Sequence, residues 1–341
     1  MEKGKRRLPA EWETQRAVLL AWPHDATDWV EMLDEIEPLY LELARAIARF
    51  EPVWILCHDD DHHRRVSATL AQAGIPPARI RLLRAPFNDT WIRDYGPIGV
   101  REGEAVHWLD FTFNGWGGKF DAAFDNQVSR TLHDAGTFEG GLETVPLVLE
   151  GGAIDNDGGG TLLTTASCVL TSTRSPELGR SGWEREWSRR FGSEHVIWLE
   201  HGWLAGDDTD GHVDMLARFT APDTLAYVNC TDAHDEHFAP LAALEAQLKT
   251  LRTRDGRPYR LVPLPIPPAK HDATGRRLPA SYANFLIING AVLTPVYGDT
   301  ADEIALNRLH GCFPGRTIIP VNALPLIRQG GSIHCATMQL Y

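Results

Sequence analysis

The sequence has few cysteines and lacks the features of an exported or membrane-anchored protein. Its 341 residues contain five cysteines, an odd number with no Cys-x-x-Cys spacing, which argues against a disulfide framework and against a zinc ribbon. No run of about 18 apolar residues is present, so no membrane span is expected. No apolar stretch follows the basic residues near the start, so we expect no signal peptide and a cytoplasmic protein.

Basic residues are scarce relative to acidic ones. The chain carries 33 Lys and Arg against 46 Asp and Glu, a net charge of −13. Nucleic acids and anionic membranes attract proteins through Lys and Arg, so we expect neither as a partner. An acidic chain suits a cationic substrate, although acidity mainly favours solubility.

The sequence also lacks a Pro-, Gly- or Ser-rich linker, so we expect a single domain over residues 1–341. Apolar runs rich in β-branched residues alternate with stretches of helical periodicity, which predicts an α/β fold. The expected strands cover 17–22, 53–57, 80–85, 144–150, 195–200, 261–266, 283–289 and 317–322. The expected helices cover 28–50, 59–73, 176–191, 238–252 and 300–311.

Local signals refine three of these boundaries. Asn289 and Gly290 between two apolar runs predict a hairpin. Ser175 and Pro176 fit the N-cap and the first position of the helix over 176–191. The run HDDDHHRR resembles a metal cluster, but we interpret it as a solvated helix start after a strand.

Five short segments each end a predicted strand and carry a polar residue that is unusual there. These polar residues lie at positions 94, 150, 212, 284 and 335, separated by steps of 56, 62, 72 and 51 residues. Such spacing favours several copies of one supersecondary unit of about 60 residues around a shared centre.

Cys335 differs from the other four cysteines in its surroundings. Two glycines lie just upstream and His334 adjoins it, and glycine permits close approach of the backbone to a ligand. A thiol becomes a good nucleophile when a cation stands nearby. The remaining cysteines lie among apolar neighbours and are expected to be small core residues.

Four acid–base candidates accompany this cysteine. His212 and Asp214 are two residues apart, so on a strand they would face the same side. They fit an outward-facing polar strand, or the start of an iron site of two histidines and one carboxylate. Glu150 is either a strand end in water or a buried acid or base, and Asp94 forms either a turn contact or part of a site.

Together these residues could act on a guanidinium ion. Asp94 and Asp214 could hold its planar fork of donors, which stays charged at all ordinary pH values. Cys335 could then attack the central carbon. His212, paired with Glu150, could protonate the departing ammonia and later activate water, and this chemistry needs no metal.

Seven segments, in order along the chain, resemble the family of agmatine deiminases and bacterial, Porphyromonas-type peptidylarginine deiminases, within the guanidine-modifying or pentein superfamily. They cover 9–23, 88–97, 113–120, 149–165, 207–219, 281–292 and 330–339. The resemblance implies a five-bladed α/β propeller, the pentein fold, of repeated ββαβ units around a central active site.

The resemblance also implies roles for the candidate residues. Cys335 would be the nucleophile that forms a covalent amidino-thioether, with His212 and Glu150 as the acid–base pair. Asp94 and Asp214 would bind the guanidinium. Three further residues match pocket positions, although the tryptophans fit core packing equally well: Asn284, Trp91 and Trp116. No cofactor and no metal is implied.

Relatives of this family tend to carry Gln where this chain has Met338, with Gln339 next. The sequence therefore does not determine which chemical group the substrate carries at the end away from its guanidinium. The implied reaction converts agmatine and water into N-carbamoylputrescine and ammonia. Peptidyl-arginine, free arginine or another small guanidine are the alternative substrates. An iron oxygenase with a jelly roll and a propeller kept only for binding are the other classes, and a homodimer is expected.

Overall fold

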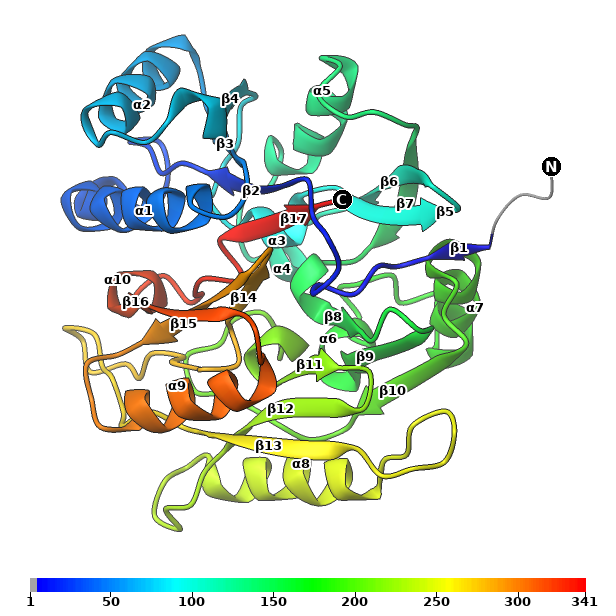
Figure 1. Ribbon diagram of the computed structural model, residues 1–341. Coiled ribbons are helices and arrows are strands. Elements are labelled where there is room, and N and C mark those ends of the chain that lie inside the picture. The colour runs from blue at the N-terminus through cyan, green and yellow to red at the C-terminus, as the bar shows by residue number, and fades with distance from the viewer. Residues whose placement is uncertain (1–4) are drawn as a thin grey trace.

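The computed structural model describes residues 5–341, so the first four residues of the basic N-terminal segment, on which the signal-peptide prediction partly rests, lie outside it. Strands within 5–341 form five sheets grouped around the middle of the molecule, with the longer helices outside them (Figure 1). None of the helices in this range is long and apolar enough to cross a membrane.

Four of the sheets repeat one unit, which the third sheet illustrates. Strand β11 (Ala217–Ala221) forms an antiparallel hairpin with β12 (Thr224–Asn229). Helix α8 (Phe238–Thr250) follows, and β13 (Arg260–Pro265) then pairs parallel with β12. A parallel pair needs a crossover connection, and the helix supplies it while covering the sheet.

The other three copies keep this order of hairpin, helix and parallel strand. The first contains β5 (Ile98–Glu102), β6 (Ala105–Thr112), α5 (Val128–Asp134) and β7 (Leu142–Val148). The second contains β8 (Ile154–Asn156), β9 (Thr161–Thr165), α7 (Arg180–Phe191) and β10 (His195–Leu199). The fourth contains β14 (Leu286–Ile288), β15 (Ala291–Val296), α9 (Ala301–Cys312) and β16 (Thr317–Asn322).

The fifth sheet joins the two ends of the chain. Its strand order is β17-β2-β3-β4, and the C-terminal β17 (Thr337–Leu340) pairs antiparallel with β2 (Ala17–Ala21). Helices α1 (Leu33–Ala48) and α2 (Asp60–Gln72) connect β2, β3 (Val53–Cys57) and β4 (Ile80–Arg84). The short β1 (Arg6–Arg7) extends the first sheet beside β5. The last strand therefore completes the sheet that β2 begins.

Short helical turns occupy the connections. They are α3 (Ile92–Tyr95), α4 (Gly115–Gly118), α6 (Ala166–Val169), α10 (Leu324–Ile327) and the 3-10 turns Val30–Met32, Pro77–Arg79, Asp125–Gln127, Gly151–Ala153 and Val213–Met215. The α/β fold and the repeated unit are confirmed, and each predicted strand and helix is present near its expected range.

One predicted helix start is wrong. Ser175 adopts a positive φ of 48°, and its hydroxyl accepts a hydrogen bond from the Val148 backbone N–H, 2.9 Å away, instead of capping a helix. Helix α7 begins at Arg180, with Gly179 as its N-cap. The Ser-Pro pair therefore belongs to a turn packed against the preceding sheet.

The placement of the polar segments at strand ends is right for the segment of Glu150, which directly follows β7, and wrong for the other four. Each segment lies in the connection that enters the first strand of a sheet: Asp94 in α3, Glu150 and His212 beside 3-10 turns, Asn284 just before β14 and Cys335 just before β17. In particular, His212 and Asp214 do not lie on a strand. A connection does not impose the strict alternation of side chains that a strand does, so neighbouring side chains can face the centre together.

Candidate active site

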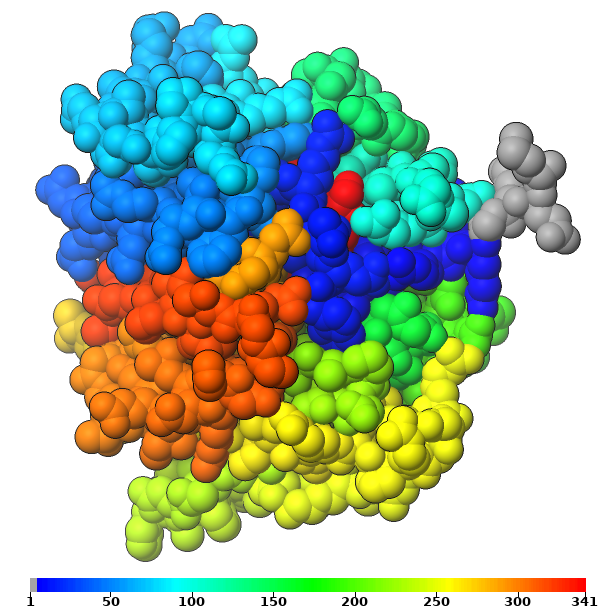
Figure 2. Space-filling model, viewed as in Figure 1, coloured from blue at the N-terminus to red at the C-terminus, as the bar shows by residue number. Residues whose placement is uncertain are grey.

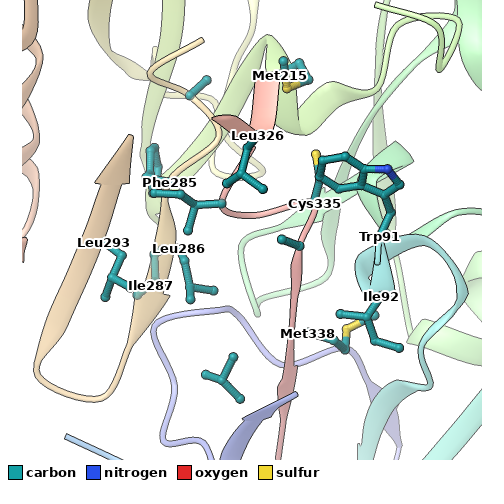
Figure 3. Packing of buried hydrophobic residues seen from close by; sticks show 14 of the residues in the cluster. Trp91, Ile92, Met215, Phe285, Leu286, Ile287, Leu293, Leu326, Cys335 and Met338 are labelled. Atoms are coloured by element: carbon teal, nitrogen blue, oxygen red, sulfur yellow. The ribbon is translucent and has the colours of Figure 1, made fainter. Parts of the chain in front are cut away.

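A pocket of about 210 Å³ opens where these connections meet. Four predicted site residues line it: Trp91, Asp94, Trp116 and Cys335. Figure 3 shows the Cys335 side chain next to the Trp91 indole, above the start of β17. Gly331, which we expected to approach a ligand, approaches this indole instead, because a Cβ there would lie 2.4 Å from the ring.

Gly152 lies close to three side chains of the predicted site. A Cβ at this position would lie 2.6 Å from His212 Nδ1, 2.9 Å from Asp94 Oδ1 and 3.1 Å from Asp214 Oδ2. Only glycine leaves room for all three side chains. The structure therefore brings together three of the predicted residues from two different connections, at a glycine of a third.

Asn284 positions the candidate nucleophile. Its side-chain oxygen accepts hydrogen bonds from the backbone N–H groups of His334 (2.9 Å) and Cys335 (3.3 Å), and its Nδ2 lies 3.2 Å from Cys335 Sγ. Asp214 Oδ2 lies 3.6 Å from the same sulfur. Burial raises the pKa of Cys335 well above its usual value, and the carboxylates of Asp214 and Asp94 raise it further. These effects favour the neutral thiol over the thiolate.

Asp94 is fixed by two donors. Trp116 Nε1 donates to its Oδ2 and the Gly152 backbone N–H to its Oδ1, each at 2.9 Å. Burial raises the pKa of Asp94 to about 6, with a further contribution from Asp214, while His212 opposes the rise. Trp116 itself has a φ of 54°, a region that bulky residues rarely adopt, so its indole is held at the site at a cost in backbone strain.

His212 is fully buried, and neither ring nitrogen has a hydrogen-bond partner. Its Nδ1 lies 3.7 Å from Asp94 Oδ1. Burial alone would lower the pKa of His212, but the Asp94 carboxylate and other neighbours raise it well above its usual value. The surrounding negative charge therefore favours the imidazolium form of the ring, which can donate a proton.

Asp214 keeps one oxygen free. Its Oδ2 accepts from His334 Nδ1 at 2.7 Å, whereas its buried Oδ1 accepts no hydrogen bond. Burial would raise the pKa of Asp214, but the hydrogen bond and the charge of His334 lower it. A buried, ionised oxygen without a donor is costly, so it marks a place for a cationic ligand.

Glu150 has a different partner from the predicted one. Its Oε1 accepts from Arg174 Nε at 2.7 Å, and its Oε2 has no hydrogen bond. Glu150 and His212 are neighbours without a hydrogen bond between them. Together with Cys168 they place three potential metal-ligand atoms within 4.8 Å of one another, but Arg174 already neutralises the carboxylate. An iron site built on His212 and Asp214 does not correspond to this cluster.

Sequence reasoning missed four residues near the site. Arg174 and Cys168 flank Glu150 and His212, and Cys168 is thus more than the plain core residue that we expected. His334 and Glu11 lie on the other side, beside Asp214. His334 could be noticed in the sequence because it adjoins Cys335. Arg174 and Glu11 could not, because in the sequence alone they resemble ordinary charged surface residues.

Comparisons with known proteins agree over the whole length. The model of the Porphyromonas-type peptidyl-arginine deiminase family matches residues 7–340. An agmatine deiminase of Stutzerimonas stutzeri (strain A1501) is 32% identical over 355 residues, which cover 97% of this chain and 94% of the relative. Such matches include the N-terminal segment that carries Glu11.

Solved structures share the pentein fold. A cysteine-to-serine variant of C. jejuni agmatine deiminase with substrate bound is 36% identical, with a TM-score of 0.91 over 98% of this chain and 96% of that one. A Porphyromonas gingivalis protein, provisionally described as an arginine deiminase, is 47% identical, with a TM-score of 0.91 over 98% of each chain. The chain thus belongs to the Porphyromonas-type peptidyl-arginine deiminase family.

Proposed function

We propose that this protein is a hydrolase that converts agmatine and water into N-carbamoylputrescine and ammonia. One observation carries the proposal: the Cys335 thiol and the Asp94 carboxylate line one pocket, and two further groups lie against them. Asp214 Oδ2 is 3.6 Å from the Cys335 sulfur and His212 Nδ1 is 3.7 Å from Asp94 Oδ1, while Asp214 Oδ1 is left without a donor. Relatives named agmatine deiminases match the whole chain and support agmatine as the substrate.

Asp94 and Asp214 bind the guanidinium in this proposal. At about 4 Å and an effective dielectric constant of about 20, each charge contact contributes about 4 kcal/mol before desolvation. The cation offsets the two carboxylate charges that raise the pKa of Cys335. The thiol therefore releases its proton to solvent as the substrate binds, and Trp91 and Trp116 exclude water from the pocket walls.

The reaction then proceeds in two halves. The Cys335 thiolate attacks the central carbon and forms a C–S bond, and the His212 imidazolium protonates the leaving nitrogen as the C–N bond breaks and ammonia departs. Neutral His212 next takes a proton from water, whose oxygen attacks the amidino-thioether. Collapse breaks the C–S bond and releases N-carbamoylputrescine, while the proton of the added hydroxyl group passes to the departing sulfur and returns Cys335 as the thiol. Glu150 supports the positive charge on His212.

The charge of the pocket lining favours a second positive charge on the substrate. Besides Asp94, the lining includes Asp28, Asp89 and Asp208, against a single cation, Arg276. Burial raises the pKa of Asp89 to about 7, and the charge of Asp28 contributes to the rise, so a cation near them would be stabilised. The ammonium group of agmatine fits this lining better than the carboxylate of free arginine.

Ammonia release from agmatine, free arginine and an arginyl peptide tests the proposal. We expect turnover of agmatine by the wild type and by Cys312→Ser, whose thiol lies at the end of α9, and none by Cys335→Ser. Turnover of the arginyl peptide alone would agree with the proposed deimination chemistry but would overturn agmatine as the substrate. No turnover, with no labelling of Cys335 by an amidine electrophile, would identify a propeller that only binds.

We also propose that residues 1–341 act as one domain, because β17 pairs with β2 and so links the last strand of the chain to one near its start. A homodimer in the cytoplasm remains our prediction for its assembly and location, since two-fold dimers are the commonest oligomers. Sedimentation velocity checks the dimer.

A further inference from the structure

His334 is held between two carboxylates beneath the pocket. Its Nδ1 lies 2.7 Å from Asp214 Oδ2, and its Nε2 lies 2.7 Å from Glu11 Oε1. Its side chain is only 1% exposed. Both distances fall at the short end of the range for hydrogen bonds between ions. The reaction described above assigns no role to this ring.

We propose that His334 is a positioning residue, a buried imidazolium ion that clamps the Asp214 carboxylate from the side opposite the substrate. Ionised carboxylates can only accept hydrogen bonds, so two of them at the two ring nitrogens require an N–H on each nitrogen. A neutral imidazole carries one N–H and would leave one carboxylate facing a lone pair.

The charges around the ring balance only when it is protonated. Glu11 Oε2 accepts from Arg218 Nη2 at 2.5 Å, and Arg93 Nη1 lies 3.6 Å from Glu11 Oε1. Asp155 Oδ2 accepts from Arg218 Nε at 3.3 Å. Three carboxylates, those of Glu11, Asp155 and Asp214, thus face two guanidinium groups. The imidazolium supplies the third positive charge of a network that is almost fully buried.

The clamp determines which Asp214 oxygen faces the substrate. Because His334 occupies Oδ2, the unpartnered Oδ1 is the atom left for a guanidinium. Glu11 belongs to the segment before β2, which lies across the middle of the face seen in Figure 2. The N-terminal segment therefore supports the pocket from behind, through Glu11 and His334, although it contributes no wall to it.

The protonation state can be measured in the free protein by nitrogen-15 NMR of the histidine rings. The chain has 14 histidines, and at pH 8.5 those with an ordinary pKa, about 6.5, carry one ring N–H. We expect two rings with N–H on both nitrogens, one lost in His212→Gln and one in His334→Gln. If His334→Gln fails to fold, the ring that still carries an N–H on both nitrogens in His212→Gln is assigned to His334. A single N–H on His334 at pH 8.5 would overturn the proposal.

The positioning role rests on the proposed function and has its own readout. His334→Gln should raise KM for agmatine about 10- to 100-fold, the effect of losing one hydrogen bond to a charged group, and change kcat less. His310→Gln, at an exposed position in α9, is the matched control and should leave KM unchanged. Equal KM in both variants would contradict the role. Failure of the wild type on agmatine would refute the proposed function but not the NMR result.

Discussion

Asp94 should set the acid limit of the activity. Its carboxyl must be ionised to bind a guanidinium, and burial raises its pKa to about 6. Below that pH the carboxyl takes up a proton and the binding charge is lost. We therefore expect kcat/KM for agmatine to fall about tenfold per pH unit below about 6. A profile that stays flat to pH 4.5 would mean that Asp94 titrates like an exposed aspartate.

Trp116 offers a second check on that limit. Its indole N–H donates to Asp94 and holds the pKa of that carboxyl down, so Trp116→Phe should move the acid limb to higher pH. Trp203→Phe is the control, since Trp203 is 45% exposed. The test is the dependence of kcat/KM on pH, measured for both variants. An acid limb that does not move in Trp116→Phe would mean that Asp94 does not set the acid limit.

Gly152 should tolerate no side chain without loss of activity. An added Cβ would displace His212, Asp94 and Asp214 together, and a misplacement of about 1 Å can cost about 100-fold in rate. We expect Gly152→Ala to lower kcat/KM for agmatine by about 100-fold or more. Gly159→Ala is the control, because the nearest atoms to a Cβ there lie at an ordinary 3.5 Å. Equal kcat/KM in the two variants would contradict the prediction that a Cβ at Gly152 displaces the neighbouring side chains.

The candidate site divides into a part that sequence reasoning could find and a part that it could not. Cys335, His212 and Asp214 were conspicuous because of their spacing and their glycine neighbours. Glu11 and Arg174 were not, because their partners lie 323 and 24 residues away along the chain. A buried ion pair leaves no periodic pattern, so only three-dimensional proximity distinguishes it from two surface charges.

At the scale of the element, the end of α7 should be the more sensitive of two similar helix ends. Gly192 and Gly74, just beyond α7 and α2, have φ values of 66° and 70°. A Cβ on Gly192 would lie 1.9 Å from the Arg6 carbonyl oxygen, whereas nothing lies within 4 Å at Gly74. Gly74→Ala should cost about 1 kcal/mol of unfolding free energy through strain alone.

Gly192→Ala should cost clearly more than that, about 2 kcal/mol or above, because β1 must also move away from α7. Urea unfolding of both variants gives the comparison. Equal losses would mean that the contact between Gly192 and Arg6 contributes nothing to stability.

Periodicity predicted the long elements well and the connections poorly. The runs 53–57 and 317–322 matched β3 and β16, and for the fully buried β3 the reason is that a strand covered on both faces needs a continuous apolar run. The start of α7 was misplaced, since Ser175 serves a turn rather than a cap. The polar segments were assigned to strand ends because single-sequence patterns do not show where the chain crosses from one sheet to the next.

At the scale of the whole molecule, the ring of sheets should fold as one unit that depends on its closing strand. Leu340 is fully buried in β17, which pairs with β2 at the opposite end of the chain. Leu340→Asp places an unpaired charge there, at a cost of several kcal/mol. We expect the variant to lose its entire thermal transition by circular dichroism, although four sheets contain no altered residue.

Thr317→Asp is the matched control, because Thr317 is an exposed strand residue and should leave a single, nearly unchanged transition. Asp94, His212 and Cys335 come from connections that enter three different sheets, so loss of closure should remove activity and structure together. If Leu340→Asp instead unfolded in two steps, with most of the helical signal surviving the first, the sheets would be separate folding units. The proposal of one domain over 1–341 would then be wrong.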